Sequence, residues 1–159
     1  MLVESKRPYR GYITATYRVT LPRLILNRLV MAYVRLGLPP GKYHLMTVRG
    51  RKSGLFHTTP ISVMKINGKR WLVAPYGERQ WVKNARAAGQ VVLRRGRRSE
   101  VVAIEEELDS LQSAPVLQRY VTEEPITRRF FDATPLSPLQ DFIAEAPRHP
   151  VFRIVDPPR

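Results

Sequence analysis

The middle of the chain is a series of short β-prone segments separated by glycine turns, and this pattern restricts the fold more than any other feature. Asn67-Gly68 is typical of a type I′ hairpin turn, in which both central residues adopt positive φ. The flanking segments 56–66 and 70–74 are therefore expected to pair as antiparallel strands. Further strands are expected at 44–49, 91–94, 97–104 and 151–155.

Helices are expected on both sides of this strand-rich region. Thr20 is a candidate N-cap for a helix that runs to about Leu36, since Gly37 and two prolines follow. Shorter helices are expected at 81–88, 110–121, 126–132 and 138–144. Strands with helices at their ends predict the α+β class and an antiparallel barrel with an N-terminal helix and short C-terminal helices.

The length and composition set further limits. A chain of 159 residues fits one domain, 1–159, in which we expect 1–19 to be a flexible arm. Cysteine is absent and the three histidines are scattered, so neither a disulfide framework nor a metal site is expected. The most apolar stretch, Leu24–Leu36, is shorter than the about 20 residues of a membrane span, and no signal peptide is visible. We therefore expect a cytoplasmic protein.

Positive charge is concentrated in the centre. From Lys42 to Arg98 there are 14 lysines and arginines against one acid, Glu78. A region this basic favours an anionic partner: nucleic acid, an anionic membrane or a polyanionic small molecule. The run RRGRR, Arg94–Arg98, is either a nucleic-acid-binding hairpin or a solvated turn. Because no DNA- or RNA-binding motif accompanies it, nucleic acid is not the favoured partner.

One basic turn has the composition of an anion-binding site. It lies within the segment VRGRKSGLFHTTPI, where Gly50 and Gly54 let the backbone approach a ligand closely. Arg51, Lys52 and Ser53 between them supply two cations and a hydroxyl for charge-assisted hydrogen bonds. It is not a Walker A loop, because Arg51 stands where that motif requires glycine. A solvated basic turn is the alternative interpretation.

A second segment, APYGERQWVKNARAAG, combines a glycine loop with the start of a short helix. Trp81 and Asn84 behind such a loop can present an aromatic face and polar groups to a planar ligand. The alternative is that Trp81 packs in the core and that Asn84 caps a helix or is exposed.

Taken together, these segments resemble the deazaflavin-dependent nitroreductase family. The elements GRKSG, TTPI, NGK, VAPYG, WVKNARAAG and VVLRRGRR follow one another in the family's order and spacing, over roughly residues 43–105. The resemblance implies a split β-barrel that uses coenzyme F-420, a deazaflavin that carries a phosphodiester and a polyglutamate tail. It also implies hydride transfer from the reduced cofactor to a quinone, a nitro compound or an activated alkene.

The resemblance also implies which residues contact the cofactor. The basic turn would hold the phosphate, while the loop and the helix start would frame the ring. The implied cofactor-binding residues are Arg51, Lys52, Ser53, Gly54, His57, Thr58, Thr59, Pro60, Ala74, Pro75, Tyr76, Gly77, Trp81, Val82 and Asn84. His57 stands where many relatives carry arginine. Whether this position contacts the phosphate or the tail is therefore left open, or the contact depends on pH.

Several interpretations stay open. No catalytic residue can be assigned, although Tyr76, Tyr120 or another phenol is a candidate proton donor. The alternatives to an F-420-dependent reductase are a non-catalytic cofactor- or ligand-binding split-barrel protein, and a relative that uses FMN or haem. The segment 21–36 is either a helix packed on the barrel or a peripheral membrane helix. The arginines of RRGRR are also candidates for the cofactor's tail, and a homodimer is expected by analogy with many split barrels.

Overall fold

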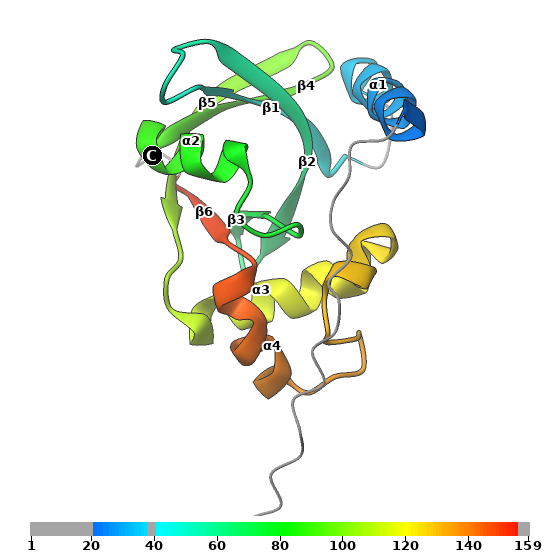
Figure 1. Ribbon diagram of the computed structural model, residues 1–159, viewed down its shortest axis with the longest axis vertical. Coiled ribbons are helices and arrows are strands. Elements are labelled where there is room, and N and C mark those ends of the chain that lie inside the picture. Colours follow the sequence, from blue (N-terminus) through cyan, green and yellow to red (C-terminus); the bar gives the residue numbers. More distant parts are fainter. Residues whose placement is uncertain (1–20, 38–40, 156–159) are drawn as a thin grey trace, which may run out of the picture.

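Six antiparallel strands close into a barrel in the computed structural model, which describes residues 21–37 and 41–155 (Figure 1). The order around the barrel is β1-β2-β3-β6-β5-β4, and β4 returns to β1. The strands are β1 (Tyr43–Arg49), β2 (Phe56–Ile66), β3 (Lys69–Val73), β4 (Gln90–Arg95), β5 (Arg98–Glu106) and β6 (Val151–Val155). The predicted α+β barrel is confirmed, and each expected strand is present within two residues of its expected bounds.

Positive φ angles occur where the turn chemistry of the sequence requires them. Asn67 and Gly68 have φ of 50° and 74°, as a type I′ turn between β2 and β3 demands. Gly96, with φ of 58°, lies in the turn between β4 and β5. The sequence placed this turn one residue earlier, at Arg95-Gly96.

The helices lie outside the barrel wall. Helix α1 (Leu21–Arg35) ends before Gly37, whose φ is 69°, and α2 (Gln80–Ala88) ends at Gly89, whose φ is 65°. Thr20 and the arm 1–19 lie outside the described residues. The C-terminal elements are α3 (Ser110–Glu123), the 3₁₀ helix η1 (Pro125–Phe130), α4 (Leu139–Glu145) and the 3₁₀ turn η2 (Ala146–Arg148).

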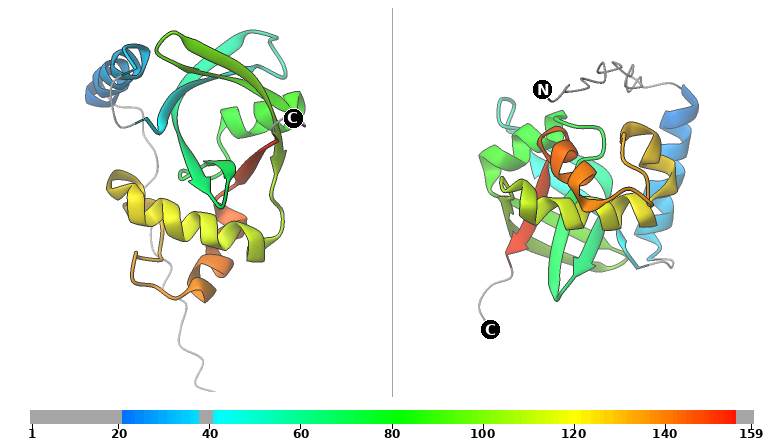
Figure 2. Two further views of the ribbon diagram at one scale, coloured as in Figure 1. Left: turned by 180° about the vertical axis from the view of Figure 1, so that it is seen from behind. Right: turned by 90° about the horizontal axis from the view of Figure 1, so that it is seen from below.

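Two apolar clusters hold these layers together. One fills the barrel and includes Met46, Leu72 and Phe152. The other lies between the barrel and the C-terminal helices, where Trp71 packs with residues such as Leu117 and Phe142. Figure 2 shows α3 and α4 below the barrel and α1 along its side.

A partly buried ion pair also ties the end of α3 to the barrel. The Lys42 Nζ lies 2.8 Å from Oε1 of Glu124, and the Tyr43 hydroxyl donates to the other carboxylate oxygen at 3.0 Å. Burial lowers the pKa of Lys42, but the Glu124 carboxylate outweighs this effect and the net change is upward. The pair therefore favours its charged form and fixes the end of α3 against the start of β1.

The barrel is open along part of β2. This strand pairs with β1 from Phe56 to Ser62, but it pairs with β3 only from Val63 to Ile66. Strand β3 ends at Val73, and its other edge pairs with β6 from Arg70 to Val73. The first half of β2 therefore has one edge without a β3 partner, and the functional site lies beside this edge.

Candidate functional site

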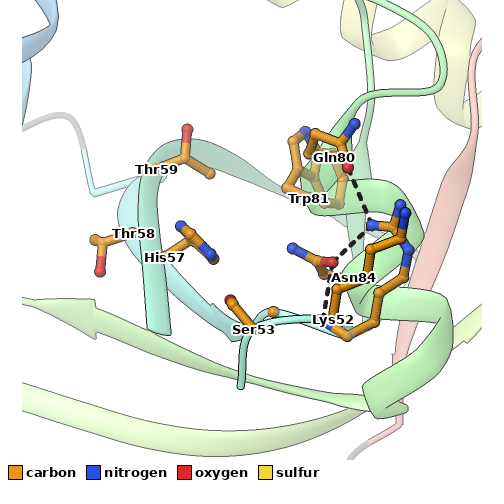
Figure 3. A pocket seen from close by; sticks show the side chains of 10 residues that line it. Lys52, Ser53, His57, Thr58, Thr59, Gln80, Trp81 and Asn84 are labelled. Carbon is orange, nitrogen blue, oxygen red and sulfur yellow. Dashed lines mark hydrogen bonds between the residues drawn. The ribbon is translucent and has the colours of Figure 1, made fainter. Parts of the chain in front are cut away.

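A pocket of about 390 Å³ lies between the first half of β2, the β1–β2 turn and α2 (Figure 3). Its lining combines cationic, hydroxyl, amide and aromatic groups. The lining residues are Gly50, Arg51, Lys52, Ser53, His57, Thr58, Thr59, Gln80, Trp81 and Asn84. The two segments that the sequence singled out therefore face each other across one cavity.

The β1–β2 turn is folded tightly by its own hydrogen bonds. The Gly50 N–H donates to the Leu55 carbonyl at 2.7 Å, and the Gly54 N–H donates to the Gly50 carbonyl at 2.9 Å. A Cβ on Gly50 would lie 2.7 Å from Oγ of Ser53 and 3.0 Å from Nε2 of His57. A side chain at position 50 would therefore have to displace the Ser53 hydroxyl and the His57 ring, and its Cβ would lie 3.1 Å from the Leu55 carbonyl oxygen.

Asn84 of α2 holds Arg51 in place. Its Oδ1 accepts a hydrogen bond from the Arg51 backbone N–H at 3.2 Å and another from the Arg51 guanidinium at 2.8 Å. The same guanidinium donates to Oε1 of Gln80 at 3.0 Å (Figure 3). Asn84 is only 5% exposed, and because its oxygen is engaged, its amide group is left as a donor. We call these three residues the Arg51 clamp.

Other polar groups of the lining are available to a ligand. In the part of the chain that the structure describes, no carboxylate pairs with Lys52, and its side chain is exposed. The His57 ring points into the cavity in Figure 3. The Ser53 hydroxyl accepts from the Leu55 N–H at 3.2 Å, which leaves its own hydrogen free to donate. These groups favour an anion.

Helix α2 is fixed firmly enough to present its side chains. Val82 and Ala85 are fully buried, and Trp81 packs against the barrel core with its ring centroid 5.8 Å from that of Phe152. At the helix end, the Arg86 guanidinium forms a forked contact with the Glu106 carboxylate of β5. Trp81 thus has one side on the core and remains part of the pocket wall.

The pocket contains eight of the fifteen residues expected to bind the cofactor. The eight are Arg51, Lys52, Ser53, His57, Thr58, Thr59, Trp81 and Asn84. The other seven do not line it: Gly54, Pro60, Ala74, Pro75, Tyr76, Gly77 and Val82. Ala74 and Val82 are almost completely buried. A role for these seven in cofactor binding stays a prediction.

The tyrosines considered as proton donors lie away from the lining. Tyr76 packs edge-on against Phe130, with ring centroids 4.7 Å apart. Tyr120 is buried beside Phe131, and burial raises the pKa of its phenol well above the ordinary value. Neither residue is part of the pocket wall, so both are placed to pack rather than to reach a ligand in this cavity.

The basic hairpin RRGRR lies at the other end of the barrel wall. Leu45 pairs with Arg94, whereas the basic turn follows Arg49 at the opposite end of β1. The tip contacts the end of α1 and the turn after it instead: the Gly96 N–H donates to the Val34 carbonyl at 3.1 Å, and the Arg95 guanidinium donates to the Gly37 carbonyl at 3.0 Å. A cofactor tail that starts at the basic turn can meet this hairpin only by running the length of β1.

Gln80 was missed by the sequence reasoning. It is a polar residue at an exposed helix start, and no pattern distinguishes it from other surface residues. Its role depends on the packing that brings Arg51, which is 29 positions away in sequence, to its side chain. Among the described residues, no group of three or more His, Cys, Asp or Glu side chains gathers in a way that could hold a metal ion.

Comparison with known proteins decides the family. The model of the family described as F420H(2)-dependent quinone reductase matches residues 29–126, which include the whole basic turn and α2. The chain belongs to this family. The resemblance seen in the sequence is confirmed, and this member of the quinone reductase family is a reductase that depends on coenzyme F-420. No protein of curated function matches the sequence.

Solved structures share the fold of this quinone reductase family member. An F420-H2 dependent reductase is 22% identical with a TM-score of 0.50, covering 72% of this chain and 94% of its own. A protein described as a domain-swapped dimer is 19% identical with a TM-score of 0.52, covering 84% and 99%. A proposed pyridoxamine 5'-phosphate oxidase from Listeria innocua is 12% identical with a TM-score of 0.51, covering 82% and 92%. Dimerisation of this chain stays a prediction.

The lining fits coenzyme F-420. The close approach at Gly50, the exposed Lys52 and the amide donor of Asn84 suit a phosphodiester. Trp81 provides an aromatic surface of the kind that a planar ring requires. The site therefore offers both the charge and the flat apolar wall that this cofactor needs.

Proposed function

We propose that this protein transfers a hydride from reduced F-420 to a quinone, with nitro compounds and activated alkenes as further candidate acceptors. The observation that carries the proposal is the pocket itself, where a basic turn and an aromatic wall face each other. The family description favours a quinone among the acceptors. When bound, the cofactor supplies the hydride, and the protein supplies binding, orientation and exclusion of water.

Each part of the lining has a separate task in this proposal. Lys52, Ser53 and the Arg51 clamp would hold the phosphodiester and the first carboxylates of the tail by charge-assisted hydrogen bonds. Trp81 would shield one side of the ring from water, since it is anchored on the barrel core. Holding both reactants in one shaped cavity reduces the entropic part of the barrier.

Oxidation of reduced F-420, followed by its absorbance, tests the acceptor. The purified protein would be given a short-chain quinone, a nitroaromatic compound and a cyclic enone at equal concentration. We expect the highest kcat/KM for the quinone. Titration with F-420 and with FMN in parallel separates the family cofactor from the flavin alternative. Tight F-420 binding without turnover of any acceptor would support a cofactor-binding protein instead.

We also propose that α1 docks on an anionic membrane, which would keep the protein at the surface of a bilayer that dissolves quinones. None of the helices that the structure describes combines the length and apolarity that a bilayer span needs. A peripheral contact is supported by Ile25, Leu29, Ala32 and Leu36, which follow one another at helical spacing and are all exposed. Val34, on the other side of the helix, is 1% exposed and faces the barrel.

Positive charge borders this apolar stripe. Arg28 and Arg35 flank it on α1, and both are exposed. The tip of the β4–β5 hairpin lies beside the end of α1 (Figure 1), where the Gly96 N–H donates to the Val34 carbonyl at 3.1 Å. The hairpin thereby adds exposed Arg97 and Arg98 to the same region. Each arginine near an anionic surface contributes about 1 kcal/mol. A cytoplasmic location at such a surface is part of this proposal.

Co-sedimentation with vesicles that contain anionic lipid tests the membrane proposal. We expect Ile25→Glu with Leu29→Glu to lower the bound fraction at least about fivefold, because two apolar side chains leave the interface. Leu136→Glu is a matched control, since Leu136 is 96% exposed but lies among the C-terminal elements. Equal binding by both variants and the wild type would assign α1 to packing alone.

A further inference from the structure

The first half of β2 has an edge without a β3 partner beside the pocket. The Val63 N–H donates to the Lys42 carbonyl at 2.8 Å, so the main-chain groups of Val63 point toward β1. In an antiparallel pair, successive residues direct these groups to alternate sides. The register from Phe56 to Ser62 is continuous, without a bulge. His57 and Thr59 therefore direct their main-chain groups toward β1, and Thr58 directs its own toward the open edge.

The side chain of Thr58 supports this assignment. Its Oγ1 lies 2.8 Å from Oγ1 of Thr47 on β1, and Figure 3 shows it pointing away from the cavity into which His57 points. Thr58 nevertheless lines the pocket. It follows that the main chain of Thr58, rather than its hydroxyl, forms this part of the wall.

The next residue with the same orientation is a proline. Pro60 pairs with Leu45 of β1 in register, and like Thr58 it directs its main-chain groups to the open edge. A proline has no N–H to donate, so it is tolerated on a strand edge that has no strand partner. On the open edge, Pro60 thus supplies a main-chain acceptor but no donor. Thr58 supplies both a main-chain donor and an acceptor, and these face the cavity.

We propose that the main-chain N–H and C=O of Thr58 are the hydrogen-bonding site for the pyrimidine-dione edge of the deazaflavin ring. This edge of the ring carries an N–H between two carbonyl groups, and an N–H with an adjacent C=O on a strand edge complements it as a neighbouring strand would. Trp81 on α2 lies across the same cavity. The inference rests on F-420 as the cofactor and adds how the ring is oriented between β2 and α2.

Amide hydrogen exchange of threonine-labelled protein tests the proposal directly. Without ligand, the Thr58 amide should exchange at least about tenfold faster than the Thr59 amide, which points toward β1. Saturation with F-420 should slow Thr58 at least about tenfold and leave Thr59 little changed. If Thr58 is already protected in the free protein, or stays unprotected at saturation, the proposal is overturned.

A pair of variants gives a second, independent measurement. Thr58→Pro removes the main-chain donor, whereas Thr58→Val keeps it and removes only the hydroxyl. We expect T58P to weaken binding of F-420, and of the tail-free deazaflavin riboside, at least about tenfold more than T58V. Equal affinities in folded variants would overturn the proposal, and if T58P does not fold, the exchange measurement decides. If the wild-type protein bound no F-420, the cofactor assignment itself would fail. If the wild type binds F-420 but the two variants bind it equally, only the Thr58 proposal fails.

Discussion

Replacing Asn84 should loosen the Arg51 clamp and weaken both the fold and the cofactor site. In Asn84→Ala the Arg51 backbone N–H and guanidinium lose their shared acceptor. The first bond is neutral and the second charge-assisted, worth about 0.5–1.5 and about 1.5–3 kcal/mol. Because Arg51 is exposed, water replaces part of the lost hydrogen bonding. We therefore expect the free energy of unfolding to fall by about 1–3 kcal/mol in total.

These values translate into measurable changes. A domain of this size loses about 2–4 °C in Tm per kcal/mol, so N84A should melt about 2–12 °C below the wild type. Ordering a released arginine costs about 0.5–1.5 kcal/mol on binding. The Kd for F-420 should therefore rise by about 2- to 12-fold. Differential scanning calorimetry and a fluorescence titration give the two numbers.

Two further variants separate the causes. Gln80→Ala removes only one bond to the guanidinium, so its effects should be smaller than those of N84A. Asn84→Asp keeps an oxygen acceptor for both bonds, but it adds a negative charge beside the phosphate site. N84D should therefore stay close to the wild type in Tm and lose more affinity than N84A. If N84A melts and binds like the wild type, the clamp contributes nothing and the reasoning is refuted.

Three other outcomes are expected. Lys52→Glu should raise the Kd for F-420 at least about tenfold. Lys65→Glu, an exposed charge reversal near the far end of β2, should leave the Kd unchanged. Equal effects of the two variants would remove the basic turn from the site. Affinity for F-420 with a long tail should fall more steeply with salt than affinity for a tail-free deazaflavin phosphate. The reason is that salt screens exposed charges beyond about 8 Å at physiological ionic strength. Identical salt slopes for the two ligands in a titration series would argue against tail contacts. Burial, and then the charge of Arg148, lower the pKa of His149 to about 4. Because this value is lower than that of the unfolded chain, about 6.5, up to about 3 kcal/mol of stability should be lost as the pH falls from 6.5 to 4. His149→Phe, which keeps the stacking on Phe131, should reduce that loss in thermal melts, and an unchanged pH profile would contradict it.

The barrel was predictable from the sequence because its turns depend on local chemistry. The Asn67-Gly68 turn and the helix end at Gly89 need positive φ, which few residues adopt, so the residue types reveal the backbone. Strand boundaries were less exact where pairing with a distant strand sets them. Strand β5 extends to Glu106, past its last apolar residue, because it pairs there with β6. The residues of β5 alone do not reveal which strand pairs with them.

The candidate site was predicted in composition but not in arrangement. The basic turn and α2 were both identified, since their glycines, cations and Trp81 stand out in the sequence. The sequence did not show that Arg51 turns toward Asn84, nor that Tyr76 packs against Phe130. Both contacts join residues that are far apart in the sequence. The opening beside β2 likewise follows from the end of β3 at Val73, since β2 pairs with β3 only from Val63 to Ile66.

The position of β6 has a consequence for how the chain reaches its native state. This strand comprises Val151–Val155, the last residues described, yet it lies between β3 and β5 and pairs with both. During synthesis, β1 to β5 can form their hairpins as they emerge, but the circle stays incomplete until residue 155 is available. Until then β3 and β5 each expose a bare edge that invites pairing with another molecule. Loss of these five residues would therefore remove a strand from between β3 and β5, so the nascent chain depends on β6 for protection against aggregation.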